Sequence, residues 1–291
     1  MPGLSRNRTI LYLTFLVLMW GVNWPLSKYA LEFTPPVLFA GLRTLIGGLL
    51  LIAIALPRWR ELRFKENWVT YAISSLLSIV CYYGFQTIGL GYMPAGIFSA
   101  IVFLQPVLVG FFAWLWLGEG MHSLKLLGLI LGFGGVASMS IGGLESGLSG
   151  IGIVLALLSA LSWALGTIYT KKTSAKLDIL WMTAMQITIG GLVMLAGGSF
   201  AEKWSSIEWK LPFIADTLFI SVFVIAAGWF VYFKLNASGE ASKVASFTFL
   251  IPVVSILISV LFMNEHVTLN LVLGILLVLG SIVLVNGRIA Q

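Results

Sequence analysis

Polar and aromatic side chains recur within long apolar stretches of this chain, where each polar group must find a partner or water. Asn23 and Trp24 follow Trp20 by three and four residues, so the three side chains share one face if this stretch is helical. A wall of aromatic rings with a few hydrogen-bonding groups suits a zwitterionic or amphipathic small molecule. We therefore predict a solute-binding site of such side chains, with Gln105 and Tyr232 beside it: Trp20, Asn23, Trp24, Tyr82, Tyr83, Gln86, Ser99, Phe103, Trp163, Thr167 and Trp229. The competing interpretation is that these residues only hold helices together.

Two prolines lie inside apolar stretches, Pro106 and Pro252. Each removes a backbone hydrogen bond and opens a helix locally. We predict that they act in gating, as a pair of hinges. The alternative is a static kink at each position.

Catalytic chemistry has little support in the sequence. An enzyme working within a membrane would need a nucleophile with a base, or metal ligands, at depth. The chain has one cysteine, Cys81, and two histidines, His122 and His266, which fall in predicted connections. No nucleotide-binding loop is present. We predict no enzymatic activity, no metal site and no cofactor.

The composition indicates which elements must position the site. Of 291 residues, 59% are hydrophobic and 10% are charged, whereas soluble proteins have about 25% charged residues. A helix needs about 20 apolar residues to cross a bilayer. We predict an all-α polytopic membrane protein with ten transmembrane helices, near residues 9–29, 36–57, 67–91, 94–117, 123–142, 150–171, 178–198, 213–235, 241–263 and 270–287.

The distribution of positive charge predicts the orientation, because cytoplasmic loops carry an excess of Lys and Arg. If both termini are cytoplasmic, the outer segments hold three cations, Lys28, Lys203 and Lys210. The inner segments then hold thirteen: Arg6, Arg8, Arg58, Arg60, Arg63, Lys65, Lys125, Lys171, Lys172, Lys176, Lys234, Lys243 and Arg288. The net charge of +6 therefore indicates membrane topology and not nucleic-acid binding.

The two halves of the chain resemble each other. A displacement of 143 residues puts Trp20 on Trp163, and a displacement of 146 puts the stretch 103–107 on 249–253. Each copy has five predicted spans, an odd number, so the second copy must insert upside down. We predict two repeats, 1–145 and 146–291, around a central cavity. Inverted repeats are characteristic of secondary transporters, whose substrate site lies between the repeats.

These motifs carry a family resemblance. Trp-Gly-x-Asn begins at Trp20, Arg43 follows in the second span, and Phe-Leu-x-Pro-Val begins at Phe103. With Leu-Gly-Glu ending at Glu119, this pattern resembles the drug/metabolite transporter superfamily, in particular its EamA-type tandem-repeat exporters. Two positions depart from the pattern: Gln186 stands where Arg43 would fall, and Asn264 replaces the glycine of Leu-Gly-Glu.

The resemblance implies ten helices, cytoplasmic termini and a cavity open alternately to each side of the bacterial inner membrane. It also implies export of amino acids, including aromatic ones. The expected partners are this small-molecule substrate and the lipid bilayer, with no nucleic acid, and the sequence leaves the oligomeric state open. The alternatives are an exporter of amphipathic drugs or other metabolites and, more distantly, a non-transporting membrane scaffold.

The charged residues complete the sequence-based expectations. All eleven acids are predicted in loops or at helix ends, with Asp216 nearest to a helix interior. Since proton-coupled carriers usually need an ionisable group at depth, we expect facilitated diffusion, or coupling through backbone and helix-end groups. Glu119 and Glu265 are expected to stabilise the N-terminal ends of the helices that follow them. Arg43 could attract a substrate carboxylate or serve as an anchor.

Overall fold

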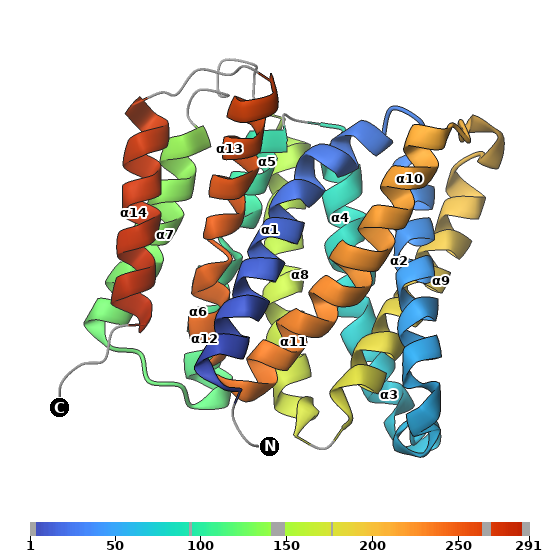
Figure 1. The fold of residues 1–291 in the computed structure, drawn as a ribbon, viewed down its shortest axis with the longest axis horizontal. Coiled ribbons are helices and arrows are strands. Elements are labelled where there is room, and N and C mark those ends of the chain that lie inside the picture. Colours follow the sequence, from blue (N-terminus) through green and yellow to red (C-terminus); the bar gives the residue numbers. More distant parts are fainter. Residues whose placement is uncertain (1–3, 93–94, 141–148, 176, 264–268, 287–291) are drawn as a thin grey trace.

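The computed structural model describes residues 4–92, 95–140, 149–175, 177–263 and 269–286, which form a bundle of helices with no β-strand among them (Figure 1). Six helical segments are long and apolar enough to cross a membrane: Arg6–Ala30, Pro36–Glu61, Phe64–Gly89, Gly150–Ser174, Ile179–Ala201 and Leu211–Ser238. Shorter apolar helices accompany them: Gln105–Leu117, Ser123–Ser138, Ala241–Ser255 and Val272–Asn286. The prediction of an all-helical, multi-pass membrane protein is confirmed.

The elements follow the chain in this order: α1 (Arg6–Ala30), α2 (Pro36–Ala55), η1 (Leu56–Glu61), α3 (Phe64–Ser75), η2 (Leu76–Cys81), α4 (Tyr82–Gly89), α5 (Ala95–Val102), α6 (Gln105–Leu117), α7 (Ser123–Ser140), α8 (Gly150–Ser174), α9 (Ile179–Ala201), η4 (Trp204–Ser206), α10 (Leu211–Phe219), η5 (Ile220–Gly228), α11 (Trp229–Ser238), α12 (Ala241–Phe247), α13 (Leu250–Met263) and α14 (Leu269–Asn286). In Figure 1, α1 begins and α14 ends at the same end of the bundle. We call it the near end, and the opposite end, where α2 and α10 begin, the far end.

Carboxylates mark the beginnings of two long helices. Asp178 is the N-cap of α9 and accepts hydrogen bonds from the backbone N–H groups of Leu180 and Trp181, both at 3.0 Å. At the far end, Glu202 accepts from the N–H groups of Val37 and Leu38, at 3.0 and 2.8 Å. Both arrangements satisfy N–H groups that lack a partner within the first helical turn.

Glycines bring α2 and α9 into close contact, and α7 packs along α14 in the same way (Figure 1). A Cβ atom added to Gly48 would lie 2.7 Å from the backbone N of Thr188, and one added to Gly191 would lie 2.5 Å from the backbone N of Leu45. Only glycine permits these approaches, which are typical of helices packed in lipid.

Two spans that we expected to be regular helices contain a π-helical segment. The segment η2 interrupts the helix Phe64–Gly89, and η5 interrupts the helix Leu211–Ser238. A displacement of 146 residues moves η2 onto 222–227, inside η5. A π-helical turn shifts the side chains that follow it around the helix axis and often occurs at functional sites.

Two other helices are broken near their prolines. Non-helical residues 103–104 separate α5 from α6, and residues 248–249 separate α12 from α13. The breaks lie about one turn before Pro106 and Pro252, because a proline ring excludes the carbonyl of the residue four positions earlier. Each proline therefore lies in the first turn of a new helix. The gating role stays a prediction.

Candidate functional site

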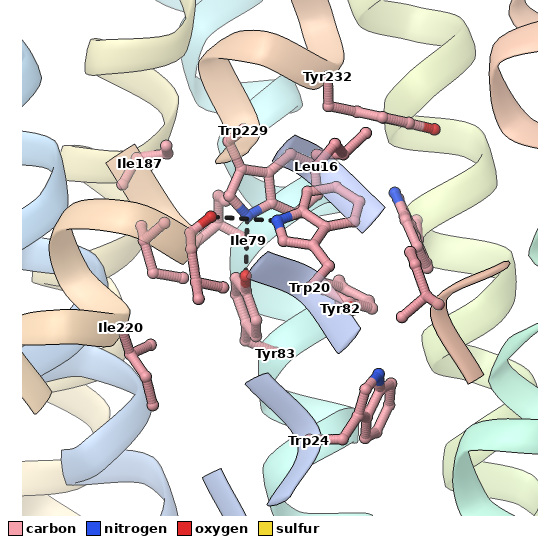
Figure 2. Close-up of a cluster of buried hydrophobic side chains, with 14 of the residues drawn as sticks. Leu16, Trp20, Trp24, Ile79, Tyr82, Tyr83, Ile187, Ile220, Trp229 and Tyr232 are labelled. Carbon is pink, nitrogen blue, oxygen red and sulfur yellow. Dashed lines mark hydrogen bonds between the residues drawn. The ribbon is translucent and has the colours of Figure 1, made fainter. Parts of the chain in front are cut away.

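Aromatic rings from several helices meet in the middle of the bundle. The ring centroid of Trp20 lies 5.4 Å from that of Trp163, 5.3 Å from Trp229 and 5.2 Å from Tyr232. These separations are typical of favourable aromatic pairs. Figure 2 shows Trp20, Trp229 and Tyr83 converging from α1, α11 and α4. The cluster therefore joins the first half of the chain to the second.

The rings enclose a small cavity of about 10 Å³, which is room for about one water molecule. Its walls include eight residues of the predicted site and two others: Trp20, Asn23, Trp24, Tyr82, Tyr83, Phe103, Trp163, Trp229, Val224 and Ile251. The aromatic site is closed in this conformation, and a solute of metabolite size requires the rings to separate.

Three predicted residues do not line the cavity. Gln86 donates to the Tyr82 hydroxyl at 3.5 Å, and Thr167 shares a hydrogen bond with the Tyr232 hydroxyl at 3.0 Å. Both residues therefore stand behind the rings and hold tyrosines in place. Ser99 is a half-buried residue of α5 away from the cavity wall.

Two wall residues, Val224 and Ile251, were not predicted. The backbone carbonyl of Val224 accepts a hydrogen bond from the Trp20 indole N–H at 3.1 Å. Val224 lies within η5, where the usual helical hydrogen-bond pattern is altered. Val224 is an apolar residue in an apolar span, so the sequence gives no signal of this contact. Ile251 could have been found from the repeat, because a displacement of 146 residues aligns Gln105 with Ile251.

Residues related by the repeat touch each other at the site. Besides the pair Trp20 and Trp163, the Trp229 indole N–H donates to the Tyr83 hydroxyl at 2.8 Å, and these two are 146 residues apart. Tyr83 and Trp229 each follow a π-helical segment closely. The segments η2 and η5 therefore place two corresponding aromatic residues, Tyr83 and Trp229, in contact at the site.

Arg43 lies behind the cavity wall. It is fully buried, and its Nη1 donates to Ser27 Oγ at 2.7 Å, while Ser27 donates to Asn23 Oδ1 at 3.1 Å. Its guanidinium carbon is 4.7 Å from the ring centroids of both Phe39 and Tyr83, a cation–π arrangement. In this conformation Arg43 does not line the cavity itself but contacts two of its wall residues, Tyr83 directly and Asn23 through Ser27.

The expectation that all acids lie in loops or at helix ends is wrong for Asp216. This residue lies within α10, inside the spanning segment Leu211–Ser238, and is only 7% exposed. The segment begins earlier than the predicted start at 213, which places Asp216 beyond the first turn. A carboxyl group is therefore buried in a spanning helix.

The near end carries an ionic cluster centred on Glu119. Its carboxylate pairs with Lys171 at 3.1 Å and Lys125 at 3.5 Å, and it accepts hydrogen bonds from the Ala241 N–H at 2.6 Å and from Ser242. Burial raises the pKa of Glu119, but the Ser242 hydrogen bond and Lys171 outweigh it and lower that pKa below its ordinary value.

This cluster corrects a second expectation. Glu119 was expected to stabilise the N-terminal end of the helix that follows it, but its N–H donors belong to α12 in the other half of the chain. The chain reversal after α11 brings these donors to Glu119. Glu265 lies outside the described residues. The described residues contain no group of three or more His, Cys, Asp or Glu side chains that could hold a metal ion.

The fold and the site together define a class: a multi-pass α-helical membrane protein whose two halves meet around a closed aromatic cavity. The sequence profile of the EamA-like transporter family matches residues 7–141 and 150–287, and the chain belongs to this family.

Curated relatives agree with this assignment. The chain is 60% identical over 288 residues to the uncharacterized transporter YvbV of Bacillus subtilis, covering 99% of this chain and 94% of YvbV. It is 29% identical over 278 residues to the uncharacterized transporter YoaV of the same organism, covering 93% and 94%. Against the uncharacterized inner membrane transporter YedA of Escherichia coli the identity is 27% over 247 residues, covering 84% and 79%. Family and names indicate a membrane transporter and not an enzyme.

A solved crystal structure shares the fold. It superposes on this chain with a TM-score of 0.83, covering 97% of both chains at 18% sequence identity. At this identity the likeness concerns the fold alone.

Proposed function

We propose that this chain is a secondary transporter that exports small metabolites, above all amino acids including aromatic ones, across the bacterial inner membrane by alternating access. One observation carries the proposal: the closed cavity whose aromatic wall is shared by both halves of the chain. A site between two halves can open to either side when the halves move against each other. Among EamA-type exporters, the sequence resembles the aromatic amino-acid exporter YddG, and the proposed cargo follows this resemblance.

Several features support ten spans in two inverted repeats, 1–145 and 146–291. The family profile matches the chain twice, and α1 and α8 run in opposite directions along the bundle (Figure 1). Helix breaks and π-helical segments recur at corresponding places in both halves. The boundary between 145 and 146 lies outside the described residues.

The orientation adds a direction to the proposal. With both termini cytoplasmic, the near end faces the cytoplasm, and the ionic cluster of Glu119 ties α12 to the end of α6 there. We infer that this cluster is the closed inner gate. In the proposed cycle, the helix breaks before Pro106 and Pro252 act as hinges when the cluster separates.

The rival cargo is an amphipathic drug or another metabolite, which an aromatic cavity also suits. A non-transporting scaffold is a more distant alternative, since a scaffold has no use for a cavity shared between two opposed halves. Uptake by the purified chain in proteoliposomes separates carrier from scaffold, and competition between solutes identifies the cargo.

The test is a proteoliposome screen with labelled tryptophan, phenylalanine and leucine, and with ethidium as a drug-like cation. Trp20→Ala and Trp163→Ala each remove one ring of the wall that would contact the solute, and one such contact is worth about 0.5–1.5 kcal/mol. We therefore expect up to about tenfold slower transport at low solute concentration. The matched control is Trp114→Ala, because Trp114 is 50% exposed on α6, away from the cavity. Absence of uptake for every solute, or undiminished uptake by both cavity variants, would contradict the proposal.

A further inference from the structure

Two opposite charges are buried between the cavity and the far end without being paired to each other. Arg43 is fully buried and Asp216 is 7% exposed. Both carboxylate oxygens of Asp216, and Nε and Nη2 of Arg43, have no hydrogen-bond partner among the described residues. Val224 lines the cavity eight residues further along the chain than Asp216, about two helical turns deeper. Asp216 therefore lies at a depth between the cavity and the far end.

The arrangement keeps Arg43 away from Asp216. No ion pair joins the two side chains, although the helices that carry them, α2 and α10, pack against each other. Arg43 is instead held by Ser27 Oγ at 2.7 Å and by the rings of Phe39 and Tyr83. These contacts hold the guanidinium in place, although its Nε and Nη2 keep no hydrogen bond, and neither carboxylate oxygen of Asp216 has a partner among the described residues.

The surroundings of Asp216 offer few other charges. The segments packed against α10 are α2, α1 and η5. The ionisable groups that these bring toward the far end are Arg43 of α2 and Lys28 and Tyr29 at the end of α1, while η5 has none. Lys28 is engaged elsewhere, because its Nζ donates to the carbonyl of Leu90 at 3.4 Å. Arg43 is thus the cation that faces Asp216.

A buried carboxylate without a donor is costly, and a carboxyl group has two ways to remove that cost. It can bind a proton, or it can move into contact with a cation. The structure offers both options at one place, because Arg43 is held by Ser27 and still has two guanidinium nitrogens without a hydrogen bond. Intramembrane carboxyl groups in such settings serve as proton relays in pumps and transporters.

We propose that Asp216 is a proton-binding site that couples solute movement to proton movement, exchanging a bound proton for contact with Arg43 during the cycle. One proton from water on one side binds a carboxylate oxygen of Asp216 and leaves to water on the other side, and no other bond changes. This inference rests on the proposed transport function and replaces the expectation of uncoupled diffusion.

The first experiment requires no solute. Infrared spectra of the chain in proteoliposomes are recorded over a range of pH, and the carboxylic C=O band of protonated side chains is followed. We expect a titrating component that is lost in Asp216→Asn and kept in Glu119→Gln, whose carboxylate is fully paired. An unchanged band in Asp216→Asn would overturn the proton site, whether or not the chain transports any tested solute.

The second experiment uses labelled tryptophan as the probe. A pH difference of about one unit supports about tenfold accumulation if one proton exchanges for one solute. We expect Asp216→Asn to lose this accumulation and to keep solute-for-solute exchange without a gradient, while Asp216→Glu keeps both. Gradient-driven accumulation by Asp216→Asn at the wild-type level would overturn the proposal. If wild type moves none of the tested solutes, the proposed function fails, and the infrared result alone decides on the proton site.

Discussion

Two buried carboxyl groups, Glu119 at the near end and Asp216 toward the far end, are held in opposite ways. Glu119 is paired with two lysines and with donors at the start of α12. Asp216 has no hydrogen-bond partner for either oxygen among the described residues, although Arg43 lies close by. A fully paired carboxylate holds helices in one arrangement, whereas an unpaired one changes its protonation or its partner when the helices move. In our proposal the first carboxyl group holds the inner gate closed, and the second one carries a proton.

The largest effect is expected when the paired carboxylate is removed. Glu119→Ala breaks the ion pairs with the buried Lys125 and with Lys171, so that Lys125 keeps only the half-exposed Glu240 as a described carboxylate partner. It also leaves the N–H groups of Ala241 and Ser242 in α12 without their acceptor. Breaking a buried ion pair in this way costs about 3–5 kcal/mol of stability. Thermal unfolding of the purified protein in detergent measures the change. Glu208→Ala is the control, because Glu208 pairs with Lys210 on the exposed surface and its loss should change little. Equal effects of the two variants would contradict the assigned role.

A smaller effect is expected from acidification. The pKa of folded Glu119 lies below its ordinary value, so its charged form stabilises the fold above the unfolded value of about 4.3. This stability is lost as the pH falls through the lower, folded pKa. We expect the unfolding temperature of wild type to fall more steeply on acidification than that of Glu119→Gln. Parallel pH profiles for the two proteins would show that the cluster does not depend on the Glu119 charge.

The smallest effect on stability is expected at Asp216. Asparagine has nearly the same shape and removes a charge that has no partner in this conformation. We therefore expect Asp216→Asn to change the free energy of unfolding by no more than about 1 kcal/mol, or to raise it. The same unfolding assay applies. A loss as large as that of Glu119→Ala would mean that Asp216 is paired in the folded protein, and the comparison would break down.

The sequence was sufficient for the all-helical membrane fold and for most residues of the cavity wall, because both depend on local signals. Apolar length marked the helices, and an offset of 143 related Trp20 to Trp163 before their contact was visible. Contacts between distant segments were not predictable. Nothing near Glu119 in the sequence indicates that its donors lie more than a hundred residues away in α12. The π-helical segments were missed as well, because their composition is that of any apolar helix.

The position of Asp216 was misjudged for a related reason. Its distance from the predicted helix start was short, and only packing against α2 and α1 shows that the side chain is buried. Burial of a charged group is decided by neighbouring helices, which a single segment of sequence does not specify. Polar groups near predicted helix ends therefore deserve the same scrutiny as those at the centre of a span.

The most direct test of a solute site between the halves is whether a bound solute protects a residue of the cavity wall from chemical labelling. Val224→Cys is made on a Cys81→Ser background, since Cys81 is the single cysteine of the chain. A small thiol reagent should label Val224→Cys as the protein opens, and a transported solute should slow that labelling. Glu61→Cys is the control, because Glu61 is exposed in η1 and the solute should not change the rate at which its cysteine is labelled. Labelling of Val224→Cys at the same rate with and without a solute that the protein transports would contradict the account.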